Sequence, residues 1–256
     1  MGIPPGSLLY RLRASLIAGL SPLDPVTTFP DAGGTYDATG AGSTRPVYLA
    51  TTTGQNLVRF DGADDRMLLP SNPALDYSDA AGWTVFGFCR PLATGWRWIL
   101  SRPSGSWVGV NGGGFLTWTR FAGADLISTG LMTGGAFRSF VVTGGAGNLK
   151  MHVGGVKVFD AAYTLTHTSG QQTIGANPTP GEFFQGDMVE LGQYARKLSD
   201  AEALEIHDEF ATLYPDMGLI DLGARARSAG LAQRANLAGQ YIPQFCRWKI
   251  GVAGGA

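Results

Sequence analysis

The sequence predicts an all-β protein: an antiparallel two-sheet β-sandwich with one short C-terminal capping helix and an extended C-terminal arm. Short apolar segments recur through the middle of the chain with turn residues between them, which is typical of antiparallel sheets. Glycine supplies 38 of the 256 residues and falls between these segments, where tight turns need positive φ. A sandwich of roughly 200–250 residues is a common single domain, so one core without disulfide staples is expected.

The strand candidates are short runs with alternating or continuous apolar side chains, bounded by turn residues. Two of them flank an Asp-Gly turn within residues 58–69. The others are Trp83–Arg90, Trp96–Ser101, Trp107–Val110, Phe115–Phe121, Phe137–Thr143, Leu149–Val153, Val156–Phe159, Thr173–Ile174 and Met188–Tyr194. Residues 15–28 predict an irregular, proline-containing loop.

The clearest hairpin lies within residues 151–158. Gly154 and Gly155 separate two alternating segments, and two glycines suit a type I′ turn because both central residues need positive φ. Alternation also assigns the faces. We expect core-facing side chains at Met151, Val153, Val156 and Val158, and solvent-facing side chains at His152 and Lys157.

One helix follows the last strand. Ser199 and Glu202 have the spacing of a capping box, in which each side chain accepts the backbone amide of the other. An apolar side at roughly helical spacing follows, formed by Leu204, Phe210 and Leu213 with Ile206 near its edge. His207, next to Asp208, is expected on the solvated side.

Three ordered motifs carry a family resemblance. They are Asp61-Gly62-Ala63-Asp64-Asp65, Gly186-Asp187-Met188-Val189-Glu190 and Leu198-Ser199-Asp200-Ala201-Glu202. Together with residues 29–39 and 45–48, they resemble the concanavalin A-like, laminin-G-type jelly-roll family over about residues 7–214. Gly33-Gly34-Thr35 departs from the family's usual Ser-Gly-Asn-Gly. The resemblance implies a jelly-roll domain over residues 1–214 and a C-terminal extension over 215–256. It specifies no activity, because the family includes lectins, adhesins, hydrolase accessory modules and virion proteins.

The sequence argues against catalysis. Glycan hydrolysis needs two carboxylates about 5–10 Å apart, yet the segments between residues 83 and 160 carry only Asp125 and Asp160. The Glu-x-Asp-x-x-Glu strand of the family's β-glucan hydrolases is absent. The three histidines are scattered, no Gly-x-Ser-x-Gly motif occurs, and no Cys/His cluster suggests zinc. We therefore expect no enzyme activity.

Two candidate ligand sites stand out. Trp96, Trp98 and Trp118, beside Arg120, could form a platform for stacking on sugar rings, with Trp107 on a neighbouring strand. The alternative is that these tryptophans fill the core, as in many sandwiches. Asp61, Asp64 and Asp65 form an acidic turn that could bind calcium, or the carboxylates of Asp61 and Asp64 could accept turn amides instead. Calcium is the one cofactor that remains open.

The C-terminal extension differs in composition. Residues 217–256 carry a net charge of +4, whereas the rest of the chain carries −5. This segment either packs on its own domain or reaches a neighbouring subunit. In the second case its contact residues would be Arg225, Arg227, Arg234, Phe245, Arg247 and Trp248. Cys89, within a predicted strand, is expected to be a buried free thiol, with a disulfide to Cys246 as the alternative.

Two classes of function remain. The first is a non-catalytic bacteriophage virion component, head-decorating or tail-associated, that assembles with other virion proteins and as a homo-oligomer. The alternative is a carbohydrate-binding, lectin-like module for adhesion to host-surface glycans. No apolar run reaches the roughly 18–20 residues of a membrane helix, and no signal peptide is evident. We therefore expect synthesis in the host cytoplasm and a location in the virion. The net charge of −1 argues against a nucleic-acid binder.

Overall fold

The structure is a computed structural model that describes residues 3–103, 106–120, 125–165, 169–177 and 182–217. The chain divides into two compact units, residues 1–221 and 222–256, and all described residues belong to the first. The six residues expected to make contacts in the arm, and Cys246, lie outside the described residues. Within them no helix has the length and hydropathy to cross a membrane.

Sheet A contains eight strands. They are β1 (Leu8–Arg13), β4 (Val47–Ala50), β5 (Asn56–Asp61), β7 (Trp83–Pro91), β12 (Arg138–Gly145), β13 (Asn148–Val153), β14 (Val156–Ala162) and β16 (Gln185–Tyr194). Their order is β14-β13-β12-β7-β16-β5-β4, and β1 also pairs with β16.

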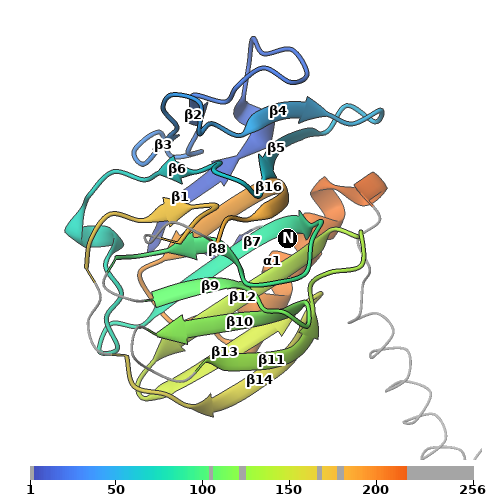
Figure 1. Ribbon diagram of the computed structural model, residues 1–256. Coiled ribbons are helices and arrows are strands. Elements are labelled where there is room, and N and C mark those ends of the chain that lie inside the picture. Colours follow the sequence, from blue (N-terminus) through green and yellow to red (C-terminus); the bar gives the residue numbers. More distant parts are fainter. Residues whose placement is uncertain (1–2, 104–105, 121–124, 166–168, 178–181, 218–256) are drawn as a thin grey trace, which may run out of the picture. The chain divides into compact units, whose positions relative to one another are not determined.

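Sheet B also contains eight strands, and it lies against sheet A (Figure 1). They are β2 (Thr28–Phe29), β3 (Ala38–Thr39), β6 (Met67–Leu68), β8 (Arg97–Ser101), β9 (Ser106–Val110), β10 (Phe115–Arg120), β11 (Leu126–Leu131) and β15 (Thr173–Ile174). Their order is β11-β10-β9-β8-β15-β6-β3-β2. Neighbouring strands of both sheets run antiparallel, so the predicted two-sheet sandwich is confirmed.

Strand β7 shows why the core has two layers. Val85 and Cys89 point into the layer between the two sheets, whereas Phe86 and Phe88 point into a second layer on the other side of sheet A. Because successive side chains alternate between faces, burial on both sides requires the nearly continuous apolar run of this strand. Cys89 is a buried free thiol, as expected, and burial, followed by the charge of Asp187, raises the pKa of this thiol.

Helix α1 (Asp200–Leu213) covers the second layer. The capping box is confirmed: Glu202 N donates to Ser199 Oγ at 3.2 Å, and Ser199 N donates to Glu202 Oε2 at 2.8 Å. The predicted apolar side is partly wrong, since Leu213 is 37% exposed. The buried positions of the helix are instead Ala203, Ile206, His207 and Phe210.

Both histidines expected at the surface near this helix are buried. His207 is 1% exposed and lies 2.7 Å from Ser139 Oγ through Nδ1. His152, on β13, is 3% exposed. The prediction was wrong because it treated the outer face of sheet A as solvated, whereas α1 packs there. The Gly154-Gly155 turn has φ values of 57° and 75°, both positive as a type I′ turn requires.

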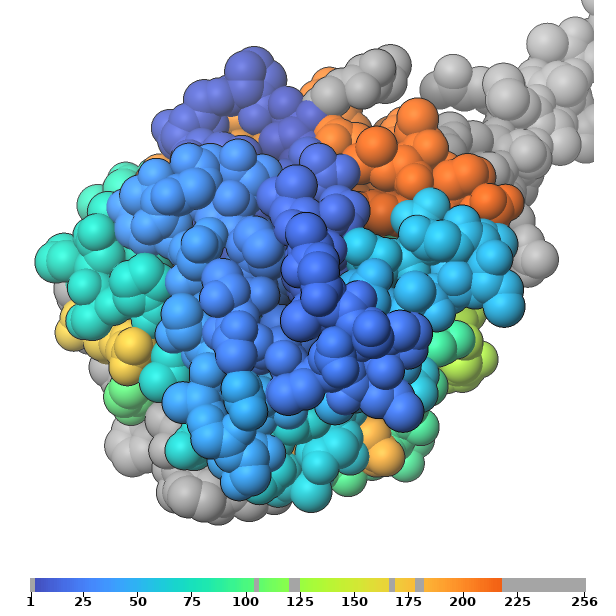
Figure 2. Space-filling view, turned by 90° about the horizontal axis from the view of Figure 1, so that it is seen from above, coloured from blue at the N-terminus to red at the C-terminus, as the bar shows by residue number. Residues whose placement is uncertain are grey.

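The first third of the chain closes one end of the sandwich. Residues 14–16 form a short 3₁₀ helix, η1 (Ala14–Leu16), and no named strand occurs between it and Thr28, as the predicted irregular loop requires. Figure 2 looks onto this end, where blue segments of the first 50 residues lie beside the orange helix α1. An ion pair joins them, with Arg11 Nη1 2.8 Å from Glu209 Oε1. After α1, the 3₁₀ helix η3 (Pro215–Met217) places Met217 in the layer under the helix.

Candidate functional site

The outer face of sheet B is the sheet surface that carries no α-helix among the described residues, because α1 packs on sheet A. Alternation along the strands determines which side chains reach this face. Val108 and Val110 of β9 enter the core between the sheets, so Trp107 projects outward and is half-buried. On β10, Leu116 and Trp118 enter the same core, which leaves Thr117 outside.

Three tryptophans gather on this face, and we call Trp96, Trp98 and Trp107 the tryptophan patch. The ring centroids of Trp96 and Trp98 are 5.7 Å apart, and those of Trp98 and Trp107 are 5.2 Å apart. Trp98 is only 2% exposed, whereas its two neighbours are half-buried. Trp98 therefore supports the patch from within, and Trp96 and Trp107 present ring surface to solvent.

Indole hydrogen bonds fix the orientation of the patch. Trp98 Nε1 donates to Glu182 Oε2, and Trp107 Nε1 donates to the carbonyl oxygen of Arg102 at 2.9 Å. A buried indole N–H usually requires such a partner. With both nitrogens bonded to the protein, the rings of Trp98 and Trp107 are held in place before any ligand arrives.

Trp118, one of the candidates for sugar stacking, belongs to the core. Its side chain is 1% exposed, its ring stacks on Trp83 with centroids 4.3 Å apart, and its Nε1 donates to Tyr163 Oη at 2.9 Å. The core alternative is thus correct for Trp118, and burial also removes Trp98 from direct stacking. The side chain of Arg120 lies outside the described residues. The alternation of β9 could have identified Trp107 as the outward-facing residue.

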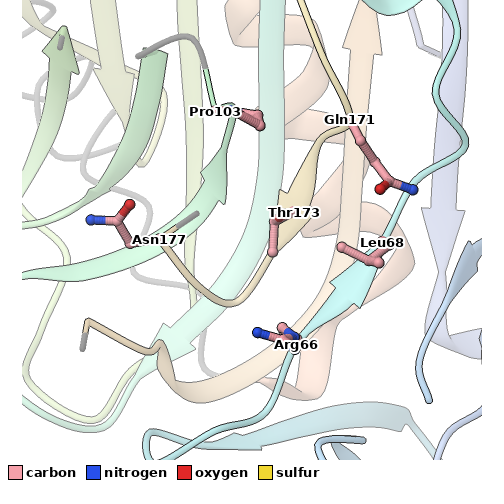
Figure 3. Close-up of a pocket in the computed structure, with 6 residues that line it drawn as sticks. All are labelled: Arg66, Leu68, Pro103, Gln171, Thr173 and Asn177. Carbon is pink, nitrogen blue, oxygen red and sulfur yellow. The ribbon is translucent and has the colours of Figure 1, made fainter. Parts of the chain in front are cut away.

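A pocket of about 230 Å³ opens beside the patch. Its lining residues come from four separate parts of the chain: Arg66, Leu68, Pro103, Gln171, Thr173 and Asn177 (Figure 3). Leu68 of β6 pairs with Thr173 of β15, which pairs with Ser101 of β8. Ser101 in turn pairs with Trp107. No sequence motif marks these residues, since only the β6–β15–β8 pairing assembles them.

The pocket and the patch share a polar connection. Asn177 Nδ2 donates to Glu182 Oε2 at 3.3 Å, and the same oxygen accepts from Trp98. On the other side of the pocket, Gln171 Nε2 donates to the carbonyl oxygen of Leu69 at 2.9 Å. The amide side chains at both ends are therefore fixed by neighbouring groups.

Carboxylates are scarce on this face. The strands of sheet B contain no Asp or Glu. At the margin, Asp125 accepts from Thr119 Oγ1 at 2.7 Å. The fully buried carboxylates Asp187 and Glu190 belong to sheet A, where arginines hold them: Arg59 Nε lies 2.7 Å from Asp187, and Arg13 Nε lies 3.0 Å from Glu190.

The acidic turn between β5 and β6 brings three carboxylates within 4.8 Å of one another. Asp61 Oδ1 accepts from the amides of Ala63 and Asp64 at 2.7 and 3.3 Å, and Asp65 Oδ2 accepts from the amide of Asp61 at 2.7 Å. Burial raises the pKa of Asp65 to about 6. The turn-amide role is thus confirmed for Asp61 and held by Asp65 in place of Asp64. Calcium binding here stays a prediction.

Solved structures with a similar fold come from toxins and a sialidase. The binding domain of Paraclostridial mosquitocidal protein 1 has a TM-score of 0.61 and 11% identity, covering 80% of this chain and 52% of that chain. A Trypanosoma rangeli sialidase mutant displaying trans-sialidase activity has a TM-score of 0.61 and 13% identity, covering 81% and 33%. The botulinum neurotoxin serotype D binding domain has a TM-score of 0.57 and 12% identity, covering 79% and 51%.

At sequence identities this low, the similarity to these structures shows a shared fold and nothing about function. The chain spans about half the length of the two toxin chains and a third of the sialidase chain. No curated protein sequence matches the chain significantly.

A family model described as the concanavalin A-like lectin/glucanases superfamily matches residues 61–203. The matched range is more than half of the 256 residues and runs from the acidic turn to the first turn of α1. It contains all three motifs in full, so the resemblance predicted from the sequence is confirmed. The chain belongs to the concanavalin A-like lectin/glucanases superfamily.

Proposed function

We propose that the domain is a non-catalytic, lectin-like recognition module that binds glycans on the outer face of sheet B. The observation that carries this proposal is the pair of half-buried tryptophans, Trp96 and Trp107, beside the pocket. Aromatic rings offer a flat apolar surface to the C–H face of a sugar. The polar groups of the pocket supply the few directed hydrogen bonds that fix a ligand's orientation.

Binding is favoured over hydrolysis by the distribution of acids. Hydrolysis by paired carboxylates requires two such groups about 5–10 Å apart across the scissile bond. The strands of sheet B carry none, and Glu182 is held by Trp98 and Asn177. Two of the similar structures are named as binding domains, which is compatible with a recognition role.

A glycan array with the purified chain, followed by calorimetry on the best ligand, tests this function. We expect Trp107→Ala to weaken binding about tenfold or more, because a tryptophan anchor typically contributes more than 1 kcal/mol and 1.4 kcal/mol is a factor of ten. Ile127→Ala is the matched control, since Ile127 is an apolar residue on the same sheet that is 44% exposed. Binding at full strength by folded Trp107→Ala, or no glycan bound at millimolar concentration, would exclude the proposal.

We further propose that the module is carried on a bacteriophage particle, as a head-decoration or tail-associated protein, and that residues 215–256 join it to other virion proteins or to further copies of itself. The opposite charges of the two parts, +4 for residues 217–256 and −5 for the rest, support this arrangement. It combines with glycan recognition, because a displayed virion domain can contact host-surface glycans.

Truncation after Met217 tests the assembly role. We choose Met217 because it is buried under α1, so a cut there keeps the described domain whole. The truncated chain should fold with unchanged thermal stability and sediment as a monomer, whereas the full chain should self-associate or bind purified particles. Unfolding of the truncated chain would place the extension in the domain's own core.

A further inference from the structure

We propose that the pocket beside the tryptophan patch selects sugars that carry a carboxylate on the ring, such as uronic acids, and that Arg66 binds this carboxylate. The inference rests on the proposed glycan-binding function and adds to it the chemical class of the ligand. Of the six described residues that line the pocket, Arg66 is the charged one.

The charge of Arg66 is available to a ligand. Its side chain is exposed, and no ion pair joins it to a carboxylate within the described part of the chain. Other arginines are committed: Arg59 and Arg90 both pair with Asp187. A planar guanidinium with five donors matches the two oxygens of a carboxylate, so Arg66 has the chemistry for an acidic ligand.

Acids close to Arg66 in sequence form no ion pair with it in the described part of the chain. Asp65 is 5% exposed and accepts the amide of Asp61. Asp61 itself accepts two amides of the turn through Oδ1. Among the described residues that line the pocket, none is acidic. A ligand carboxylate would therefore meet a positive charge without a competing protein carboxylate in the lining.

The remaining lining suits the rest of a sugar ring. Thr173 and Gln171 offer a hydroxyl and an amide, while Leu68 and Pro103 offer apolar surface. Gln171 is held by its bond to the carbonyl oxygen of Leu69, and Thr173 is held in the paired strand β15, so little ordering is required on binding. The volume of about 230 Å³ is below the roughly 300–1,000 Å³ of sites for drug-sized ligands, which suits a single ring.

The negative charge of Glu182 determines which end of the pocket a ligand carboxylate would occupy. Glu182 borders the pocket through its bond with Asn177. Figure 3 shows Asn177 and Arg66 at separate corners of the pocket, with Thr173 and Leu68 between Arg66 and the Pro103–Gln171 side. A ring carboxylate would thus lie at Arg66, away from Glu182. The next sugar of the chain could then extend toward Trp107, three paired strands away from Leu68.

The test compares uronic acid oligosaccharides with the same oligosaccharides after reduction of their carboxyl groups to alcohols. Calorimetry should show at least tenfold tighter binding of the acidic form by the parent protein, and this preference should shrink as salt rises because exposed charges are screened. Arg66→Gln should bind both forms equally, with the affinity that the parent protein has for the reduced form. Lys157→Gln is the control: it removes the positive charge of an exposed side chain on β14 of sheet A and should keep the preference.

The outcomes separate the two proposals. Equal binding of acidic and reduced oligosaccharides by the parent protein would overturn the acidic-sugar inference and leave glycan binding in place. Retention of the preference by folded Arg66→Gln would overturn the role of Arg66. If neither these probes nor any glycan on the array binds, the proposed function fails and the inference fails with it.

Discussion

Replacing Trp118 with alanine tests the two-layer core most directly, because the same residue was a candidate for sugar stacking. Its ring is 1% exposed and stacks on Trp83 at 4.3 Å. Truncation of a buried Phe or Trp typically costs 3–5 kcal/mol, and an aromatic pair adds about 0.5–1.5 kcal/mol beyond its buried area. With the bond from Nε1 to Tyr163 also lost, we expect a loss of about 5 kcal/mol, at the upper end of that range.

Urea denaturation followed by far-UV circular dichroism measures this loss. With a slope of about 2–3 kcal/mol per molar urea, the unfolding midpoint should fall by about 2 M. Trp96→Ala is the matched control: Trp96 is half-buried on the outer face, and we expect a loss of about 1 kcal/mol from its contact with Trp98. If Trp118→Ala instead unfolds within 1 kcal/mol of the parent protein and loses glycan binding, Trp118 lies at the binding face and our account of the core is wrong.

Three further variants, with Leu213→Ala as a control, test the helix and two buried ionisable groups. Ser199→Ala should lower the free energy of unfolding by about 1 kcal/mol through loss of the N-cap, whereas Leu213→Ala, at a position 37% exposed, should change it little; equal losses in urea melts would contradict the helix register. Burial lowers the pKa of His152, which outweighs the opposing charge of Asp200. The unfolded chain therefore takes up a proton as pH falls below about 6.5 while the folded chain does not, and stability should fall toward acid by up to about 1.4 kcal/mol per pH unit. In His152→Gln the melting temperature should therefore decrease less between pH 7 and pH 5 than it does in the parent protein. An equal decrease in the two proteins would argue against a buried neutral imidazole. Asp65 acts in the opposite sense: its pKa is raised from 3.8 to about 6, so its favourable contribution is present below pH 4 and is lost as pH rises through 6. The side chain of Asp65→Asn can still accept the amide of Asp61. Compared with the parent protein, this variant should gain more in melting temperature at pH 7 than at pH 4. An equal decrease at both pH values would refute this account of Asp65.

The sequence by itself determined the local elements of this protein. The capping box of Ser199 and Glu202 and the Gly154-Gly155 turn depend on neighbouring backbone groups, so residue types at short spacing were sufficient to predict them. Alternation predicted most strands of the sandwich. It missed β1, whose partner β16 lies about 180 residues away, the short strands β2, β3 and β4, and β11, where the exposed Ile127 and Leu131 weaken the pattern.

The tertiary structure alone decided what each face of a strand meets. Alternation shows that His152 and Met151 point to opposite sides, but only the packing of α1 on sheet A makes His152 as buried as its neighbour. Alternation likewise could not decide which tryptophans are buried; the packing of the two sheets places Trp118 in the core and leaves Trp107 at the surface. The pocket could not be predicted, because Arg66 and Asn177 are brought together by pairing between distant strands. A periodic pattern records which side chains share a face, whereas burial depends on which element covers that face.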